Sequence, residues 1–125
     1  MNPVEKIFEE ILKITRVEFE DIVDIVSFVN YKLRLVLKDK SFVDVGVSKR
    51  IPGRFSFHWE CKNQNLYRYD NFPDEQWKNV ETYPFHFHNG TQNKVDSSPF
   101  SADLLIGFRE FMEFVRKKLR LIIEK

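Results

Sequence analysis

Alternation of apolar and polar residues in the first half of the chain is the feature that most constrains its fold. Every second residue from Tyr31 to Leu37 is apolar, and the pattern resumes from Val43 to Val47 after a polar turn at 38–41. Successive side chains of a strand point to opposite faces of a sheet. This spacing therefore predicts a β-hairpin with one buried face.

A second hairpin is predicted after the break at 51–53, where the sequence reads Ile-Pro-Gly. Its first strand alternates between an aromatic face and a polar face, the turn lies near 63–64, and the return strand covers 66–71. The polar face consists of Arg54, Ser56, His58 and Glu60. The turn length leaves two registers open, because a slip of one residue exchanges the faces. An even-length turn pairs His58 with Tyr69, whereas an odd-length turn brings Arg68 and Asp70 onto the face of His58.

Amphipathic helices are predicted at both ends of the chain. Asn2 followed by Pro3 is typical of a helix start, and apolar residues then recur at three- and four-residue spacing through 4–12. Ser101 is the predicted cap of a second helix, whose apolar stripe runs from Leu104 to Ile122.

Two segments carry weaker signals. Residues 17–30 fit a helix or a strand, and their density of Val and Ile favours a strand. Residues 72–100 contain three prolines and are expected to be irregular. The pattern as a whole indicates one α+β domain over 1–125, with an antiparallel sheet of about five strands packed by an N-terminal helix and a long C-terminal helix. One sheet face is expected to stay free for a site.

Charge and cysteine content exclude several classes of protein. Twenty Lys and Arg stand against 19 Asp and Glu, so the net charge of +1 gives no global attraction for nucleic acid or an anionic membrane. The single Cys61 is expected to be a buried structural thiol. No apolar run reaches the ~18 residues that span a bilayer. We expect a soluble, cytoplasmic protein without membrane association.

Aromatic residues and histidines gather in one window. Ten of the aromatic residues and all three histidines, His58, His86 and His88, lie between positions 55 and 88. In an extended segment His86 and His88 point the same way. They then have two interpretations: ligands of a divalent ion completed by His58 or Asp70, or acid–base groups that titrate near neutral pH.

Three motifs stand in this window: Arg-Phe-Ser-Phe-His at 54–58, Tyr-Arg-Tyr-Asp-Asn at 67–71 and Thr-Tyr-Pro-Phe-His-Phe-His at 82–88. Together they resemble the TumE-like family, the toxin members of prokaryotic toxin–antitoxin pairs. The resemblance covers about 31–90. It implies an antitoxin partner and RNA as the target. The family pattern has histidines where this chain has Asp74, Glu75 and Phe85, which leaves a shared chemical core of His58, Arg68, Asp70, His86 and His88.

Three hypotheses follow. The first is a metal-independent endoribonuclease without a cofactor, in which His58, His86 and His88 act as base and acid, and Asp70 orients a His or Arg. Substrate binding in this hypothesis is assigned to Arg54, Arg68, Tyr67, Tyr69 and Trp77, the arginines at phosphate and the aromatics stacked on bases. The second is a metal-dependent hydrolase that uses His86, His88 and either His58 or Asp70. The third is a non-enzymatic module that binds a partner through exposed aromatics. The oligomeric state stays open, a homodimer included.

Overall fold

The structure is a computed structural model that describes residues 2–123, with the side chains of 122 and 123 outside that description. A seven-stranded antiparallel sheet follows the first helix, and its strands lie in space in the order in which they occur along the chain. The elements are α1 (Pro3–Glu18), β1 (Val23–Val29), β2 (Lys32–Leu37), β3 (Phe42–Val47), β4 (Phe55–Glu60), β5 (Leu66–Asp70), the 3₁₀ helix η1 (Glu75–Trp77), β6 (His86–Gly90), β7 (Val95–Ser97) and α2 (Leu104–Ile123).

The α+β class, the two bracketing helices and both predicted hairpins are confirmed, and the strand number is corrected from about five to seven. Within the segment expected to be irregular, 86–90 and 95–97 are strands. They were missed because they are three to five residues long and rich in polar residues, which leaves too little alternation to recognise. The strand favoured in 17–30 exists over Val23–Val29, while α1 extends to Glu18.

Local hydrogen bonds explain where the helices begin. The Asn2 side chain accepts from the Glu5 backbone N–H and the Glu5 side chain accepts from Asn2, which completes a capping box. The prediction of Ser101 as the cap of α2 is wrong. The Asp103 carboxylate accepts from the Ile106 backbone N–H at 2.9 Å, and Ser101 Oγ instead accepts from the Asp103 N–H. The predicted stripe of α2 is buried at Phe108, Met112, Val115 and Leu119, and the side chain of Ile122 lies outside the described residues.

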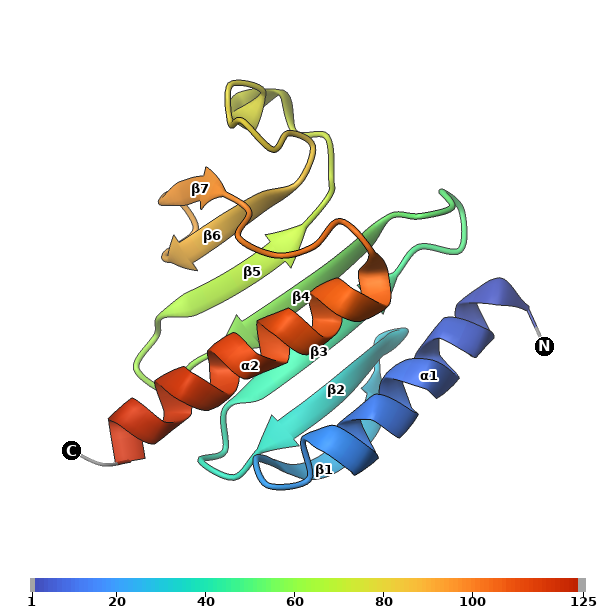
Figure 1. Cartoon of the computed structure of the whole chain (residues 1–125), viewed down its shortest axis with the longest axis vertical. Coiled ribbons are helices and arrows are strands. Elements are labelled where there is room, and N and C mark those ends of the chain that lie inside the picture. The colour runs from blue at the N-terminus through green and yellow to red at the C-terminus, as the bar shows by residue number, and fades with distance from the viewer. Residues whose placement is uncertain (1, 124–125) are drawn as a thin grey trace.

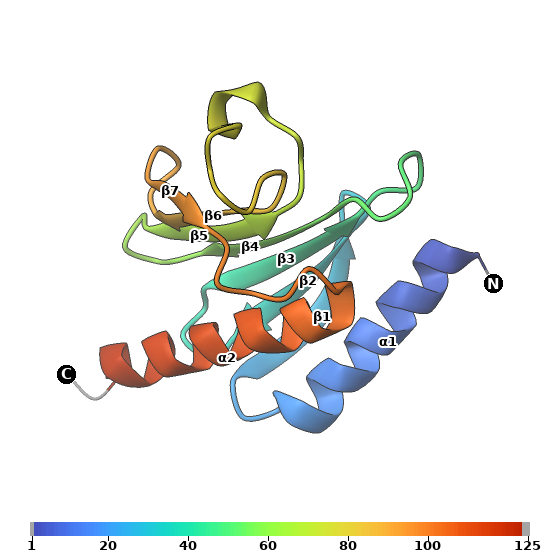
Figure 2. The ribbon, with the colours of Figure 1, turned by 45° about the horizontal axis from the view of Figure 1, so that its top comes forward.

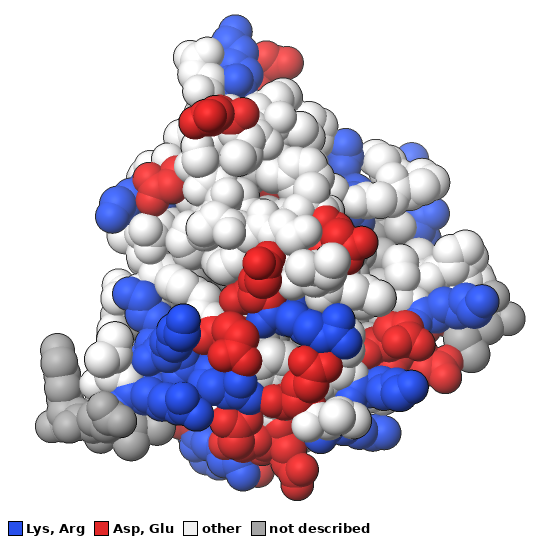
Figure 3. Space-filling model, viewed as in Figure 1, with Lys and Arg blue, Asp and Glu red and all other residues white. Residues whose placement is uncertain are grey.

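Both helices cover the same face of the sheet (Figures 1 and 2). The aromatic side chains of β4 and β5 point into this layer, where Phe57 meets Phe108 with ring centroids 5.5 Å apart and Trp59 donates from Nε1 to Ser41 Oγ at 2.9 Å. Figure 3 shows Lys and Arg side chains beside Asp and Glu side chains over the helices. Within the described residues, neither helix is long and apolar enough to cross a bilayer.

Arg116 ties α2 to the turn between α1 and β1. Its guanidinium contacts both carboxylate oxygens of Asp21 at 2.8 and 3.0 Å, donates to the Glu18 carbonyl and lies 4.6 Å from the Phe19 ring centroid. The hydrogen bond from Arg116 lowers the pKa of Asp21. Because the folded-state pKa is depressed, this contact stabilises the protein above the ordinary Asp pKa, and the stabilisation is lost as the pH falls through the folded-state value.

We therefore expect Asp21→Asn to lower the melting temperature at pH 7. The difference from the wild type should shrink as the pH falls below about 4, because Asp21 then becomes neutral in the wild type as well. Thermal unfolding followed by circular dichroism at several pH values measures the melting temperatures of the two proteins and how their difference changes with pH. A difference that is the same at pH 3 and pH 7 would contradict the assignment.

The first turn of α2 packs closely on the loop before it at Gly107. A Cβ at this position would lie 2.7 Å from the Ser101 carbonyl oxygen and 3.2 Å from Tyr69 Cε2. Tyr69 donates its hydroxyl hydrogen bond to the same Ser101 carbonyl at 2.6 Å, so the loop has little freedom to move away.

We expect Gly107→Ala to destabilise the protein by roughly 1–3 kcal/mol, since overpacking against backbone outweighs the gain in helix propensity. Ile106→Ala is the matched control, because the neighbouring Ile106 side chain is 51% exposed and its loss should change stability by about 0.5 kcal/mol or less. Urea unfolding of both variants is the measurement. A Gly107→Ala protein as stable as the wild type would show that the loop at Ser101 moves to accommodate the added methyl group.

Candidate functional site

The face of the sheet turned away from the helices carries two rows of polar side chains. The register places residues of one row directly opposite one another across β2 to β6: Arg34, Asp44, His58, Arg68 and His88. The next row crosses β3 to β6 as Gly46, Ser56, Asp70 and His86. All members of the predicted chemical core therefore lie on one face, brought together from three strands.

His58 stands in the middle of this face. Its cross-strand partner on β5 is Arg68, which is the odd-length register of the two that the sequence left open. Its Nε2 lies 3.1 Å from Glu60 Oε1, two residues along β4, and the side chain is 21% exposed. Asp44, its neighbour on β3, is occupied by two hydrogen bonds from Arg34 at 2.8 and 2.9 Å. His58 thus keeps a carboxylate partner of its own and access to solvent.

Asp70, His86 and His88 form a buried cluster at the β5–β6 side of the face. They are 6%, 2% and 2% exposed. His86 Nε2 lies 3.2 Å from Asp70 Oδ1, and His88 Nε2 lies 4.0 Å from Asp70 Oδ2. One ligand-type atom from each residue lies within 4.8 Å of the others, so this trio meets the distance requirement of a metal site. His58, the other predicted ligand, stands two strands away from β6.

Backbone carbonyls orient both imidazoles of the cluster. His86 Nδ1 lies 3.0 Å from the Pro84 oxygen, and His88 Nδ1 lies 2.8 Å from the Gln92 oxygen. A carbonyl only accepts, so each Nδ1 carries the proton, and each Nε2 faces Asp70. Burial lowers the pKa of His88, which keeps this ring neutral at pH 7. A neutral ring of this tautomer presents a lone pair to the carboxylate.

Arg68 links the buried cluster to the open face. Its Nε lies 3.8 Å from Asp70 Oδ2, and its Nη2 donates to the Gln92 side chain. Among the described residues, Nε is a buried side-chain nitrogen with no hydrogen-bond partner. Asp70 also accepts from the Phe72 backbone N–H at 2.9 Å, which holds its carboxylate toward β6.

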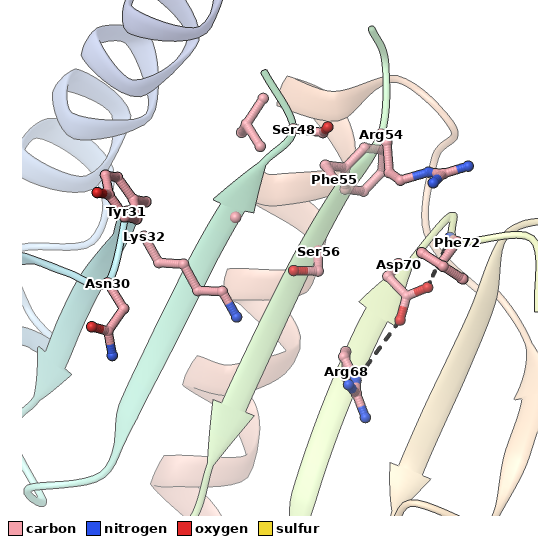
Figure 4. Close-up of a pocket in the computed structure, with 12 residues that line it drawn as sticks. Asn30, Tyr31, Lys32, Ser48, Arg54, Phe55, Ser56, Arg68, Asp70 and Phe72 are labelled. Atoms are coloured by element: carbon pink, nitrogen blue, oxygen red, sulfur yellow. Dashed lines mark hydrogen bonds and ion pairs between the residues drawn. The ribbon is translucent and has the colours of Figure 1, made fainter. Parts of the chain in front are cut away.

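A groove runs over β2 to β5 beside this cluster (Figure 4). Its larger part has a cavity volume of about 440 Å³ and contains Lys32, Arg54, Ser56, Arg68 and Asp70. An adjoining hollow of about 290 Å³ contains His58 and Glu60 and shares Lys32, Ser56 and Arg68 with the first. The two adjoining hollows are therefore lined by the His58 ring and the Ser56 hydroxyl together with four cationic side chains and three carboxylates: Lys32, Arg34, Arg54, Arg68, Asp44, Glu60 and Asp70.

Arg54 and Trp77 lie at opposite sides of the site. The Arg54 guanidinium lies over the Phe72 ring, 4.6 Å from its centroid, at the rim of the groove. Trp77 belongs to η1, in the segment 71–85 that rises from β5 and β6 on the side opposite the helices (Figure 2). Its half-buried ring meets His88 edge-on at 6.1 Å. Trp77 thus covers the cluster, and Arg54 faces the groove.

Tyr67 and Tyr69 are not where the substrate-binding prediction needs them. Both are buried, at 9% and 0% exposure, on the helix-covered face of β5. Tyr67 packs against Phe114 and Tyr69 against Phe100. Because side chains of a strand alternate, the register that brings Arg68 and Asp70 to the open face turns both tyrosines into the core.

Two further expectations can be compared with the structure. Cys61 is half-buried against the core, not fully buried as expected, and desolvation still raises the pKa of its thiol to about 12, which agrees with a structural role. The partner-binding hypothesis needed exposed aromatics, but most of the window is core, and only Phe72, at 54% exposure, is largely exposed.

Lys32 and Glu60 were not selected as site residues from the sequence. The available signal was their alternation with core residues: Lys32 stands next to Leu33, and Glu60 follows Trp59. Only the strand order shows that β2 and β4 lie close enough for both side chains to border one groove.

A comparison with family models now adds to this geometry. Residues 5–119 match the model described as Toxin TumE, which extends the resemblance from the central window to nearly the whole chain. No curated protein matches the sequence, and no solved structure matches it either. A match of this extent, with the motif residues gathered on one sheet face, shows that the chain belongs to the TumE toxin family.

Proposed function

We propose that this toxin is an endoribonuclease, and that cleavage takes place in the groove on the open sheet face without a metal ion in the bond-breaking step. Family membership makes the chain the toxin component of a toxin–antitoxin system and implies an antitoxin partner. The observation that carries the proposal is the pairing of His58 with Arg68, side by side in a groove that also contains Lys32 and Arg54.

Cleavage next to a 2′-hydroxyl needs a base for the hydroxyl proton and cations for the charge on phosphorus. His58 is the base. Glu60 accepts from its Nε2–H, which fixes the tautomer and leaves Nδ1 free to take the proton. The 2′-oxygen then attacks phosphorus, the bond to the 5′-oxygen breaks, and a 2′,3′-cyclic phosphate forms. A water molecule in the open groove protonates the leaving 5′-oxygen, and the hydroxide that remains takes the 2′-hydroxyl proton back from His58.

Arginine side chains bind the phosphate. Guanidinium groups present planar, paired donors that match phosphate oxygens. Arg68 lies directly beside His58, and Arg54 lies at the rim, where the chain of the substrate would leave the groove. Lys32 adds a third cation from β2.

Asp70, His86 and His88 act as positioning residues in this proposal. Their burial and the orientation of both Nε2 atoms toward Asp70 keep the imidazoles away from a substrate in the groove. Asp70 Oδ2 forms an ion pair with Arg68 Nε at 3.8 Å and so orients the phosphate-binding guanidinium. Acid–base roles for His86 and His88 are therefore left out of the proposal.

Inducible expression in a bacterial host tests the site in cells. We expect growth arrest with the wild type and its loss in His58→Ala and Arg68→Ala, because the first lacks the base and the second the phosphate anchor. Lys117→Ala is the control, since this exposed cation lies on α2, on the opposite layer. Equal expression is checked by immunoblot. Arrest that persists in both site variants would refute the assignment.

Cleavage of a short single-stranded RNA tests the chemistry. We expect His58→Ala to slow it by about 10²–10⁴-fold, the usual contribution of acid–base catalysis. A 2′-deoxy residue at the cleaved position should block the reaction because the attacking hydroxyl is absent, and EDTA should leave cleavage in place. Intact RNA with the wild-type protein, or cleavage of the 2′-deoxy substrate, would contradict the mechanism.

A further inference from the structure

We infer that Asp70, His86 and His88 bind one divalent transition-metal ion of the zinc type. The inference concerns the buried cluster and does not depend on the ribonuclease proposal. It starts from the acceptor atoms: two imidazole Nε2 atoms and a carboxylate face one another in a site that is nearly closed to solvent.

The hydrogen bonds around the cluster point its ligand-type atoms inward. The Pro84 and Gln92 carbonyls lie 3.0 and 2.8 Å from the Nδ1 atoms of His86 and His88, so both Nε2 atoms face the Asp70 carboxylate. Imidazole nitrogens and carboxylate oxygens that converge in this way are the ligands of a zinc-type ion. Arg68 approaches Asp70 only at Oδ2, at 3.8 Å, and its Nη2 donates to the Gln92 side chain.

Hydrogen bonds do not join all three residues. His86 Nε2 lies within hydrogen-bond distance of Asp70 Oδ1, at 3.2 Å. His88 Nε2 lies 4.0 Å from Asp70 Oδ2, beyond that distance. A metal ion, in contrast, accepts electron pairs from all three residues at once.

The distances fit a small ion. Ligand atoms about 2.0–2.1 Å from a tetrahedral zinc ion lie roughly 3.3 Å from one another. The two imidazoles approach different oxygens of Asp70, His86 Nε2 at 3.2 Å from Oδ1 and His88 Nε2 at 4.0 Å from Oδ2, and one ligand-type atom from each residue lies within 4.8 Å of the others. Two imidazoles with one carboxylate are also a ligand set that zinc and related ions prefer, whereas Mg²⁺ and Ca²⁺ require more oxygen ligands than this site offers.

The surroundings are those of a metal centre as well. Metal-binding histidines regularly donate their other ring N–H to a backbone carbonyl, which both rings do here. The Phe72 N–H holds the carboxylate, and Trp77 covers His88. Arg68 Nε, which has no hydrogen-bond partner among the described residues, lies 3.8 Å from Asp70 Oδ2, where a water bound to the ion would accept a hydrogen bond from its N–H.

Titration of untagged, EDTA-dialysed protein with Zn²⁺ tests the inference. Isothermal calorimetry and elemental analysis after desalting should give one Zn²⁺ per chain, and Zn²⁺ but not Mg²⁺ should raise the melting temperature. His86→Gln and His88→Gln should each weaken Zn²⁺ binding by about 100-fold or more. This exceeds the roughly 10–100-fold loss of metal affinity that follows when only a hydrogen-bond partner of a metal ligand is removed. His58→Gln is the matched control and should bind Zn²⁺ like the wild type, because His58 lies outside the cluster.

A second measurement covers the case in which the variants fail to fold. Nitrogen-detected NMR of the wild-type imidazoles should show Zn²⁺-dependent shifts at Nε2 of His86 and His88 and none at His58. Absence of Zn²⁺ binding at micromolar concentration, binding that His58→Gln abolishes, or shifts confined to His58 would overturn the inference. These readouts require no RNA, so the metal site and the ribonuclease proposal can fail separately.

Discussion

The rest of the structure depends on the alternation of side chains in one antiparallel sheet. In β4 and β5 every second residue enters an aromatic core under two helices, and every intervening residue reaches the open face. The burial of Phe57, Trp59 and Tyr69 therefore holds His58, Arg68 and Asp70 in place. A slip of one residue would exchange core and site together, so packing free energy directly enforces the geometry of the site.

The same register determines which charged side chains of the open face lie next to each other. Arg34 on β2 is the cross-strand neighbour of Asp44 on β3, and the two form an ion pair whose charges compensate each other. Arg68 Nε, in contrast, is a buried nitrogen without a hydrogen-bond partner among the described residues, at the border between the groove and the buried cluster. A polar atom of this kind beside a groove is available to a ligand. The segment 71–85 contacts both sites, because its Trp77 lies against His88 and its Phe72 lines the groove.

Much of the fold could be predicted because its signals are local. The Asn2 cap, the stripe of α1 and the two hairpins each depend on residues close together in the chain. The cap of α2 lies two residues after the predicted one because Ser101 and Asp103 both have suitable side chains, and it is Asp103 that accepts from the Ile106 N–H. The strands β6 and β7 could not be predicted because the pairing of β6 with β5 and of β7 with β6, more than their own sequence, makes them strands.

Hydrophobic periodicity is a local property, so the sequence alone shows which residue types are available and which face of each strand must be buried. It places His58, Arg68, Asp70, His86 and His88 in one window without identifying their neighbours. The folded chain adds the odd register, the burial of Tyr67 and Tyr69, and the separation of His58 from the trio around Asp70. These features depend on packing of the whole sheet against α1 and α2, a contact between distant parts of the chain that no local pattern encodes.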